Sequence, residues 1–248
     1  MTMLLVDAGN TRIKWALAQD GAAPGDWLAH GAVLHEKVDS LRSAWTGQGV
    51  TRAIVSNVAG AATHERLARL LLRLRIAKLE WFRAQAELAG LRNRYRNPTQ
   101  LGADRFAAAL GARALAPGKA LVVATCGTAT TVDAVSSGGE FLGGMILPGL
   151  GLMLESLARG TAQLPAASAE AVLPPAFADN TLDAIRSGCI SAQAGAIARA
   201  CAALPAELCI VSGGAAGHVA PALAVPCRVL DNIVLVGLHA AAIASPSS

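Results

Sequence analysis

The sequence contains few charged and few aromatic side chains, which make up 15% and 4% of its 248 residues. No stretch of it approaches the ~20 consecutive apolar residues that a membrane-spanning helix needs. Its N-terminus lacks the basic region and apolar segment of a secretion signal. These absences favour a cytoplasmic protein with no membrane partner.

Several signature motifs are also absent. The five cysteines form no C-x-x-C pair and the five histidines no pair at ligand spacing, so neither a disulfide framework nor a zinc site is indicated. We expect the thiols to be small buried hydrophobic groups. The sequence contains no Walker G-x-x-x-x-G-K-[ST] loop and no Rossmann G-x-G-x-x-G, so any nucleotide site must be built differently.

Apolar residues, by contrast, make up 53% of the chain, enough to bury a sizeable core. Part of the formal net charge of +4 comes from Arg66, Arg69, Arg73 and Arg75, which follow one side of a predicted amphipathic helix at 64–74. Few aromatic residues interleave with these arginines and no DNA-binding motif is present. We therefore expect a solvated helix face and no nucleic-acid partner.

The N-terminal residues carry the clearest chemistry. Residues 4–7 predict a buried strand, and a tight turn leads from it into a second strand at 15–17. Asp7 at a buried strand end is costly to desolvate unless it meets a cation, and Gly9 lets backbone N–H groups approach an anion. An ordinary hairpin is the alternative, but an acid beside anion donors is what Mg²⁺ bridging two phosphates requires. The turn comprises Asp7, Ala8, Gly9, Asn10, Thr11, Arg12, Ile13 and Lys14.

The same pattern occurs a second time. An apolar run at 121–124 leads through a Gly-Thr turn into a strand at 132–135, so that Gly127 matches Gly9 and Thr128 matches Asn10. The repeat resembles the two phosphate motifs of the actin-like ATPase and sugar kinase superfamily. That resemblance implies an α/β fold of two similar ribonuclease H-like domains, residues 1–116 and 117–248, with the active site in the cleft between them.

Strand and helix patterns alternate along the rest of the chain, which predicts mixed sheets covered by helices. A segment at 161–178, rich in Ala and Pro, shows no periodicity and is expected to be a loop. We predict strands at 27–34, 52–57, 78–82, 140–147, 208–211 and 228–230, and helices at 38–45, 106–115, 149–158, 182–204 and 233–243.

The loop at 97–105, which opens the helix at 106–115, is the second strong signal. Taken alone, Asp104 reads as a helix cap and Arg105 as a surface charge. Together with the two turns, however, the loop makes the chain similar to the type III pantothenate kinases from end to end. Further motifs in the same order are residues 143–149, Leu164-Pro165, residues 180–188 and residues 212–215.

This resemblance implies ATP-dependent phosphorylation of pantothenate to 4'-phosphopantothenate, the first step of coenzyme A biosynthesis. ATP would be bound by residues 7–14 with Gly127, Thr128, Gly213 and Gly214, and Mg²⁺ by Asp7. Asp104 would be the general base. The resemblance also implies a homodimer with pantothenate at its interface. The substrate-binding positions would be Tyr95, Gly102, Ala103, Asp104, Arg105 and Thr181.

One position departs from the family. Family members usually carry an Asp associated with K⁺ or NH₄⁺ where this chain has Thr125, so we expect a weak dependence on a monovalent cation. We interpret Asp133, the nearest other acid, as an ordinary hairpin residue.

The residues by themselves indicate only ATP-dependent transfer to a small hydroxylated acceptor. A kinase of the same architecture acting on a sugar or another alcohol, and a nucleotide-binding accessory protein of transcription, stay open as alternatives.

Overall fold

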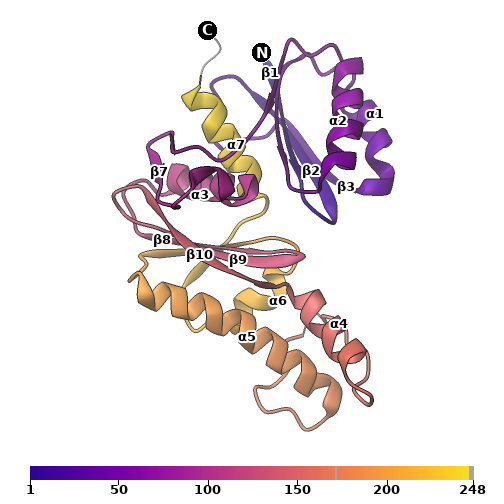
Figure 1. The fold of residues 1–248 in the computed structure, drawn as a ribbon, viewed down its shortest axis with the longest axis vertical. Helices are drawn as coiled ribbons and strands as arrows, with labels where there is room; N and C mark the ends of the chain where they lie inside the picture. The colour runs from indigo at the N-terminus through magenta and orange to yellow at the C-terminus, as the bar shows by residue number, and fades with distance from the viewer. Residues whose placement is uncertain (171, 246–248) are drawn as a thin grey trace. The chain divides into compact units, whose positions relative to one another are not determined.

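The computed structural model describes residues 1–170 and 172–245 (Figure 1). The chain divides into two compact units, the first formed by Met1–Pro117 with the segment from Asn232 onward, the second by Gly118–Asp231. Each unit is built on a mixed sheet with helices packed against it. This agrees with the α/β class predicted from the alternating patterns.

The first sheet has the strand order β3-β2-β1-β4-β5. β1, β2 and β3 are antiparallel neighbours, whereas β4 and β5 run parallel to β1. β1 is central, and all of its residues after the first are buried, which explains why it reads as a continuous apolar run. The bounds are β1 Thr2–Ala8, β2 Arg12–Gln19, β3 Ala29–Leu34, β4 Val50–Asn57 and β5 Lys78–Trp81.

One face of this sheet is covered by the α1 and α2 helices (Figure 1). Leu67, Leu70 and Leu71 form the buried stripe of α2, while its arginines lie on the more exposed side, as the amphipathic pattern predicts. The helix expected at 38–45 is divided into a 3₁₀ turn and a short α-helix. Helical elements on this side are η1 His35–Ser40, α1 Leu41–Trp45 and α2 Ala61–Arg73.

Two helices, α3 (Ala103–Leu115) and α7 (Ile233–Ala244), pack closely together in the first unit (Figure 1). A Cβ at Gly111 would lie 2.6 Å from the Ile233 carbonyl oxygen, and one at Gly237 would lie 1.7 Å from the Ala107 carbonyl oxygen. Both glycines therefore permit this approach. The sequence analysis places 233–243 in the second half, whereas this packing groups α7 with the first unit.

The second sheet repeats the first. Its strands β10-β9-β8-β11-β12 are ordered and oriented like β3-β2-β1-β4-β5, so the duplicated turn belongs to a duplicated topology. α5 covers one face, where Ile197 packs among Val122, Ala124 and Val132. Bounds are β8 Leu121–Cys126, β9 Ala129–Val135, β10 Glu140–Pro148, β11 Leu208–Ser212, β12 Cys227–Val229, α4 Leu150–Gly160, α5 Thr181–Ala203, α6 Ala216–Val219 and η3 Ala220–Ala222.

The sequence analysis missed the shortest elements, namely α6, η3, η2 (Pro98–Gln100) and the small hairpin of β6 (Glu87–Leu88) and β7 (Leu91–Asn93). The predicted loop at 161–178 contains neither helix nor strand in its described part, and Ala171 lies outside the described residues. Across the described ranges, no helix combines the length and apolar character that a bilayer crossing demands.

Candidate active site

The N-terminal turn (residues 7–14) joins β1 to β2. Its backbone is closed by the Gly9 N–H, which donates to the Arg12 carbonyl at 3.1 Å. Asp7 and Lys14 are register partners across the two strands, so their side chains leave the sheet on the same face. The hairpin thus places a carboxylate beside an ammonium group at the end of a buried strand.

Asp7 is only 8% exposed, and its Oδ1 has no hydrogen-bond partner among the described residues. Burial, followed by the negative charge of Asp104, raises the pKa of Asp7 to about 7, against the opposing effect of Lys14. A buried carboxylate oxygen without a donor is costly unless a cation meets it. Asp7 is therefore a residue that could hold a cation.

Asp104 lies in the first turn of α3, where its Oδ1 accepts a hydrogen bond from the Arg105 N–H at 2.9 Å. The N-cap of this helix is Gly102, so Asp104 is not the capping residue. Burial raises the pKa of Asp104, while the Arg105 N–H and guanidinium lower it. A Cβ at Gly102 would lie 2.7 Å from the Asp104 Oδ1, so the glycine leaves room for this carboxylate.

Arg105 and Tyr95 are brought together by the loop before α3. The Arg105 guanidinium is 6% exposed, donates through Nη1 to the Tyr95 hydroxyl at 2.8 Å, and has its carbon 5.6 Å from the centre of the Tyr95 ring. Asn93 fixes the loop through two hydrogen bonds of 3.1 Å. Its Nδ2 donates to the Pro98 carbonyl, and its Oδ1 accepts from the Tyr95 N–H. The sequence analysis missed Asn93, which carries no motif.

The Gly127-Thr128 turn joins β8 to β9 in the second unit, where the Gly127 N–H donates to the Ala129 carbonyl at 3.1 Å. Gly213, at φ +98°, packs against this turn so closely that a Cβ would lie 2.4 Å from the Cys126 carbonyl oxygen. Gly149, which the predicted site omits, is equally close: its Cβ would lie 2.1 Å from the Gly127 oxygen. Only glycine fits at either position.

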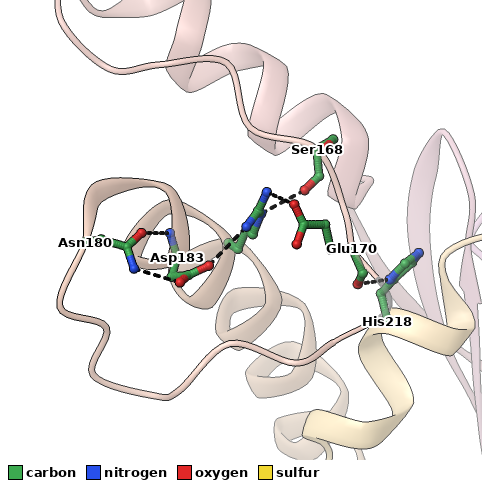
Figure 2. Close-up of polar contacts among 6 residues, drawn as sticks. Ser168, Glu170, Asn180, Asp183 and His218 are labelled. Atoms are coloured by element: carbon green, nitrogen blue, oxygen red, sulfur yellow. Dashed lines mark hydrogen bonds and ion pairs between the residues drawn. The ribbon is translucent and has the colours of Figure 1, made fainter.

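Thr181 begins α5, after the N-cap Asn180, whose side chain accepts from the Asp183 N–H at 3.0 Å. Figure 2 shows this helix start beside the preceding loop. Arg186 donates to the Ser168 carbonyl and to Asp183, each at 3.0 Å, and forms an ion pair with Glu170.

His218 on α6 holds the same loop from its other side. Its Nδ1 lies 2.8 Å from the Glu170 carbonyl oxygen (Figure 2). Ser187 adds a hydrogen bond to the Ala176 carbonyl at 3.0 Å. The loop is thus fixed to α5 and α6 next to Thr181.

A cavity of about 470 Å³ lies between α4 and α5. Its walls are mainly apolar side chains, including Met153, Leu157 and Ile185, and Thr181 and Ser156 supply hydroxyl groups. The Ser156 hydroxyl is committed to the Met153 carbonyl at 2.8 Å. Among the described residues the Thr181 hydroxyl makes no such hydrogen bond, so it is the hydroxyl of this cavity that is suited to a ligand.

Thr125 lies near the end of β8, opposite Thr131 on β9. Asp133, two residues further along β9, is 1% exposed and lies opposite Val123. Asp133 thus lies within the β8–β9 hairpin, in the strand predicted at 132–135, on the same face as Thr131.

The predicted site residues are divided between the units. The N-terminal turn, Tyr95, Gly102, Ala103, Asp104 and Arg105 belong to the first; Gly127, Thr128, Gly213, Gly214 and Thr181 belong to the second. Within the described chain, no three His, Cys, Asp or Glu side chains are grouped to hold a metal ion.

Residues 3–203 match the family model described as type III pantothenate kinase. A relative named type III pantothenate kinase from Janthinobacterium sp. (strain Marseille) is 57% identical over 254 residues, which cover 97% of each chain. A second relative of that name, from Herminiimonas arsenicoxydans, is 51% identical over 251 residues, again 97% of each chain.

Solved structures with the same fold are far more distant in sequence. The activator of the 2-hydroxyisocaproyl-CoA dehydratase from Clostridium difficile, solved with bound ADPNP, has a TM-score of 0.55 at 12% identity and covers 98% of this chain and 93% of its own. The inorganic polyphosphate/ATP-glucomannokinase from Arthrobacter sp. strain KM has a TM-score of 0.50 at 16% identity, with 96% of both chains covered. These likenesses show the actin-like ATPase and sugar kinase fold.

Proposed function

The chain belongs to the type III pantothenate kinase family, and from that premise we propose which of its residues perform the reaction. The reaction is the ATP-dependent phosphorylation of pantothenate to 4'-phosphopantothenate in coenzyme A biosynthesis. Membership in the family decides against the two alternatives that the residues alone leave open. The observation that carries the assignment of roles is the buried, unpartnered oxygen of Asp7. The charges of Asp104 and Lys14 both affect the pKa of this carboxyl group.

Phosphoryl transfer depends on positioning and charge neutralisation more than on covalent chemistry. Asp7 would hold Mg²⁺, with phosphate and water oxygens completing its coordination, and the ion would neutralise charge on the phosphates. Lys14, the register partner of Asp7, adds a positive charge on the same face of the hairpin. The backbone N–H groups of Asn10 and Thr11, the Asn10 side-chain amide and the Thr11 hydroxyl are further donors for phosphate oxygens.

Asp104 is proposed as the general base that takes the proton of the primary hydroxyl of pantothenate. Its raised pKa supports this role, because a carboxylate that is easier to protonate is a better base near neutral pH. Arg105 is proposed to bind the carboxylate of pantothenate. The Tyr95 hydroxyl, at 2.8 Å, fixes the guanidinium in one orientation for that contact.

The Gly127-Thr128 turn is proposed to bind the phosphates of ATP, and Gly213 with Gly214 to accept the adenosine. The close packing of Gly213 on Cys126 supports this grouping, because it fixes the strand end of one motif against the turn of the other. Ala103 and Gly102 complete the substrate loop before α3.

We propose a homodimer in which Thr181 binds pantothenate from the partner subunit. Large apolar side chains are exposed on α4, on α5 and in the segment between these helices, and a subunit interface would cover such side chains. They include Leu152, Leu173, Phe177 and Leu182, of which Phe177 is 99% exposed. We further propose a cytoplasmic location, where ATP is available, and a weak K⁺ or NH₄⁺ requirement because of Thr125.

An ATP-turnover assay with and without pantothenate tests this proposal. We expect ADP to form in proportion to pantothenate consumed, and Lys14→Ala to raise KM for ATP. A panel of sugars and short alcohols as acceptors is the control. Turnover that is equal on those acceptors, or independent of Lys14, would contradict the assigned roles.

A further inference from the structure

His35 makes a contact with the N-terminal turn that no sequence motif announces. It is the first residue of η1, directly after β3, and its Nε2 lies 2.7 Å from the Gly9 carbonyl oxygen. The side chain is half-buried. His35 is therefore bonded to the backbone of the turn itself, rather than to the side chains that the proposed function uses.

The direction of this hydrogen bond follows from its chemistry. A carbonyl oxygen only accepts, so the His35 Nε2 carries a proton and donates it to Gly9. On the other side of the ring, Nδ1 lies 3.4 Å from the Thr63 hydroxyl on α2. In the neutral ring protonated on Nε2, Nδ1 accepts from Thr63, so both nitrogens have a role in orienting the imidazole.

The backbone of His35 is fixed as well. Arg66 on α2 donates through Nη1 to the His35 carbonyl at 3.0 Å and pairs through Nη2 with Asp39 at 3.2 Å. The preceding residue, Leu34, is the register partner of Arg12, which ends the turn. Contacts from α2 and the register of the sheet thus position the imidazole beside Gly9.

The peptide unit between Gly9 and Asn10 explains what this bond can do. In a planar trans peptide the C=O of one residue and the N–H of the next point in opposite directions. Since His35 holds the Gly9 carbonyl on its own side, the Asn10 N–H is directed to the opposite side. Glycine permits peptide orientations that other residues resist, so without His35 this unit is free to rotate and present its carbonyl oxygen to an anion.

We propose that His35 is a positioning residue of the nucleotide site: by binding the Gly9 carbonyl, it aims the Asn10 N–H at the β- and γ-phosphates of ATP. This inference rests on the proposed assignment of residues 7–14 to those phosphates. His35 does not touch the reacting atoms, so its effect is on nucleotide affinity and leaves pantothenate binding unchanged.

A matched pair of substitutions tests this role. The amide nitrogen of Gln reaches the position of Nε2, whereas that of Asn reaches only the position of Nδ1, so His35→Gln keeps the donor to Gly9 and His35→Asn loses it. One hydrogen bond predicts a rise in KM for ATP of about 2- to 10-fold for His35→Asn. His35→Gln should stay within about 2-fold of the unaltered protein by the same scale. KM for pantothenate should not change in either variant.

Binding of AMP, measured by calorimetry, separates positioning from general loosening. AMP lacks the β- and γ-phosphates, so His35→Asn should weaken the binding of ATP and leave the binding of AMP unchanged. Equal weakening of both nucleotides, or equal losses in the Asn and Gln variants, overturns the inference. Should His35→Asn not fold, ¹⁵N NMR of the unaltered protein still tests it, because a ring proton found only on Nδ1 contradicts the bond to Gly9.

Lys14→Ala distinguishes the two levels of the argument. If it weakens ATP binding while His35→Asn does not, the role of His35 fails and the proposed function stands. If neither variant affects ATP, the assignment of the turn to the phosphates fails, and the inference fails with it.

Discussion

Asp7 and Asp104 are electrostatically coupled: burial raises the pKa of Asp7, and the negative charge of Asp104 raises it further, to about 7. Lys14 opposes both effects without cancelling them. A metal ion needs the ionised carboxylate, but burial in the folded protein disfavours that form. Stability and function are in conflict at Asp7, as is common at active sites.

This conflict predicts that Asp7→Asn stabilises the fold while it abolishes kinase activity. The pKa of Asp7 is raised above its unfolded value of 3.8, so stability is lost as pH rises from that value through about 7. A shift of this size corresponds to at most about 4 kcal/mol of unfolding free energy above pH 7, which Asn would recover in part. Thermal unfolding of the unaltered protein and of Asp7→Asn, scanned between pH 5 and pH 9 in steps of about one pH unit, measures the difference in stability.

Glu65→Gln is the control for this experiment, because it removes a negative charge from an exposed position on α2. It should leave the pH profile unchanged. The pKa of buried His239 is lowered by burial, so this residue costs stability on acidification below its ordinary value of 6.5, equally in every variant. The difference between variants therefore isolates Asp7, and an unchanged Tm for Asp7→Asn above pH 7 would show that its carboxylate is not destabilising.

Asp104→Asn should lower kcat by ~10²–10⁴, the range for a lost general base, with ATP affinity preserved. Asn retains the Oδ1 that accepts from the Arg105 N–H, so the start of α3 should stay intact. Steady-state kinetics together with thermal unfolding separate the two effects. If Asp104 acted only in the helix, kcat would be unchanged, and any effect of Asn would be seen in the thermal unfolding alone.

Thr181→Ala should raise KM for pantothenate more than KM for ATP, in a protein that is a homodimer by light scattering. The hydroxyl lost is the one at the start of α5 that faces the cavity between α4 and α5. Ser156→Ala is a matched control, since it removes a hydroxyl of the same cavity that is already bonded to the Met153 carbonyl. A fully active monomer, or equal effects of the two substitutions, would refute the shared site.

The sequence predicts the elements that are marked by local patterns. β1 and β8 are central buried strands, so their apolar runs are readable, and the Gly-containing turns after them carry recognisable motifs. α7 is also readable as a helix, because its ten buried residues are apolar or small apart from His239, but uniform burial does not indicate its partner. That partner, α3, is determined by the close approach at Gly111 and Gly237.

Other features are set by contacts between distant residues. His35 meets Gly9 across 26 positions, and Gly149 meets the Gly127-Thr128 turn across two strands, β9 and β10. β6 and β7 have only two and three residues, too few for a periodic pattern. Asp133 lies in a strand that the sequence predicts, but its burial follows from contacts that the local pattern does not show.

Because this chain has Thr125 where its resemblance to the family leads us to expect an acid, we predict that the enzyme is nearly independent of monovalent cations. A threonine hydroxyl can ligate K⁺ as a neutral oxygen, but it lacks the full negative charge that provides most of the attraction in a partly buried site. We expect substantial activity with Mg²⁺-ATP in Na⁺ or Tris buffer and only modest stimulation by K⁺ or NH₄⁺.

Thr125→Asp should increase the dependence of activity on K⁺. Thr125→Asn should leave this dependence unchanged, because Asn has the shape of Asp without its charge. Asp133 is the acid that could supply a charge instead, since it lies on the same face of the sheet as Thr131, the register partner of Thr125. However, it is offset by two residues along β9, which separates the two Cβ atoms by roughly 7 Å. A titration of activity with K⁺ tests the prediction. Negligible activity without K⁺, with saturation at low millimolar K⁺, would mean that the cation site persists without an acid at position 125.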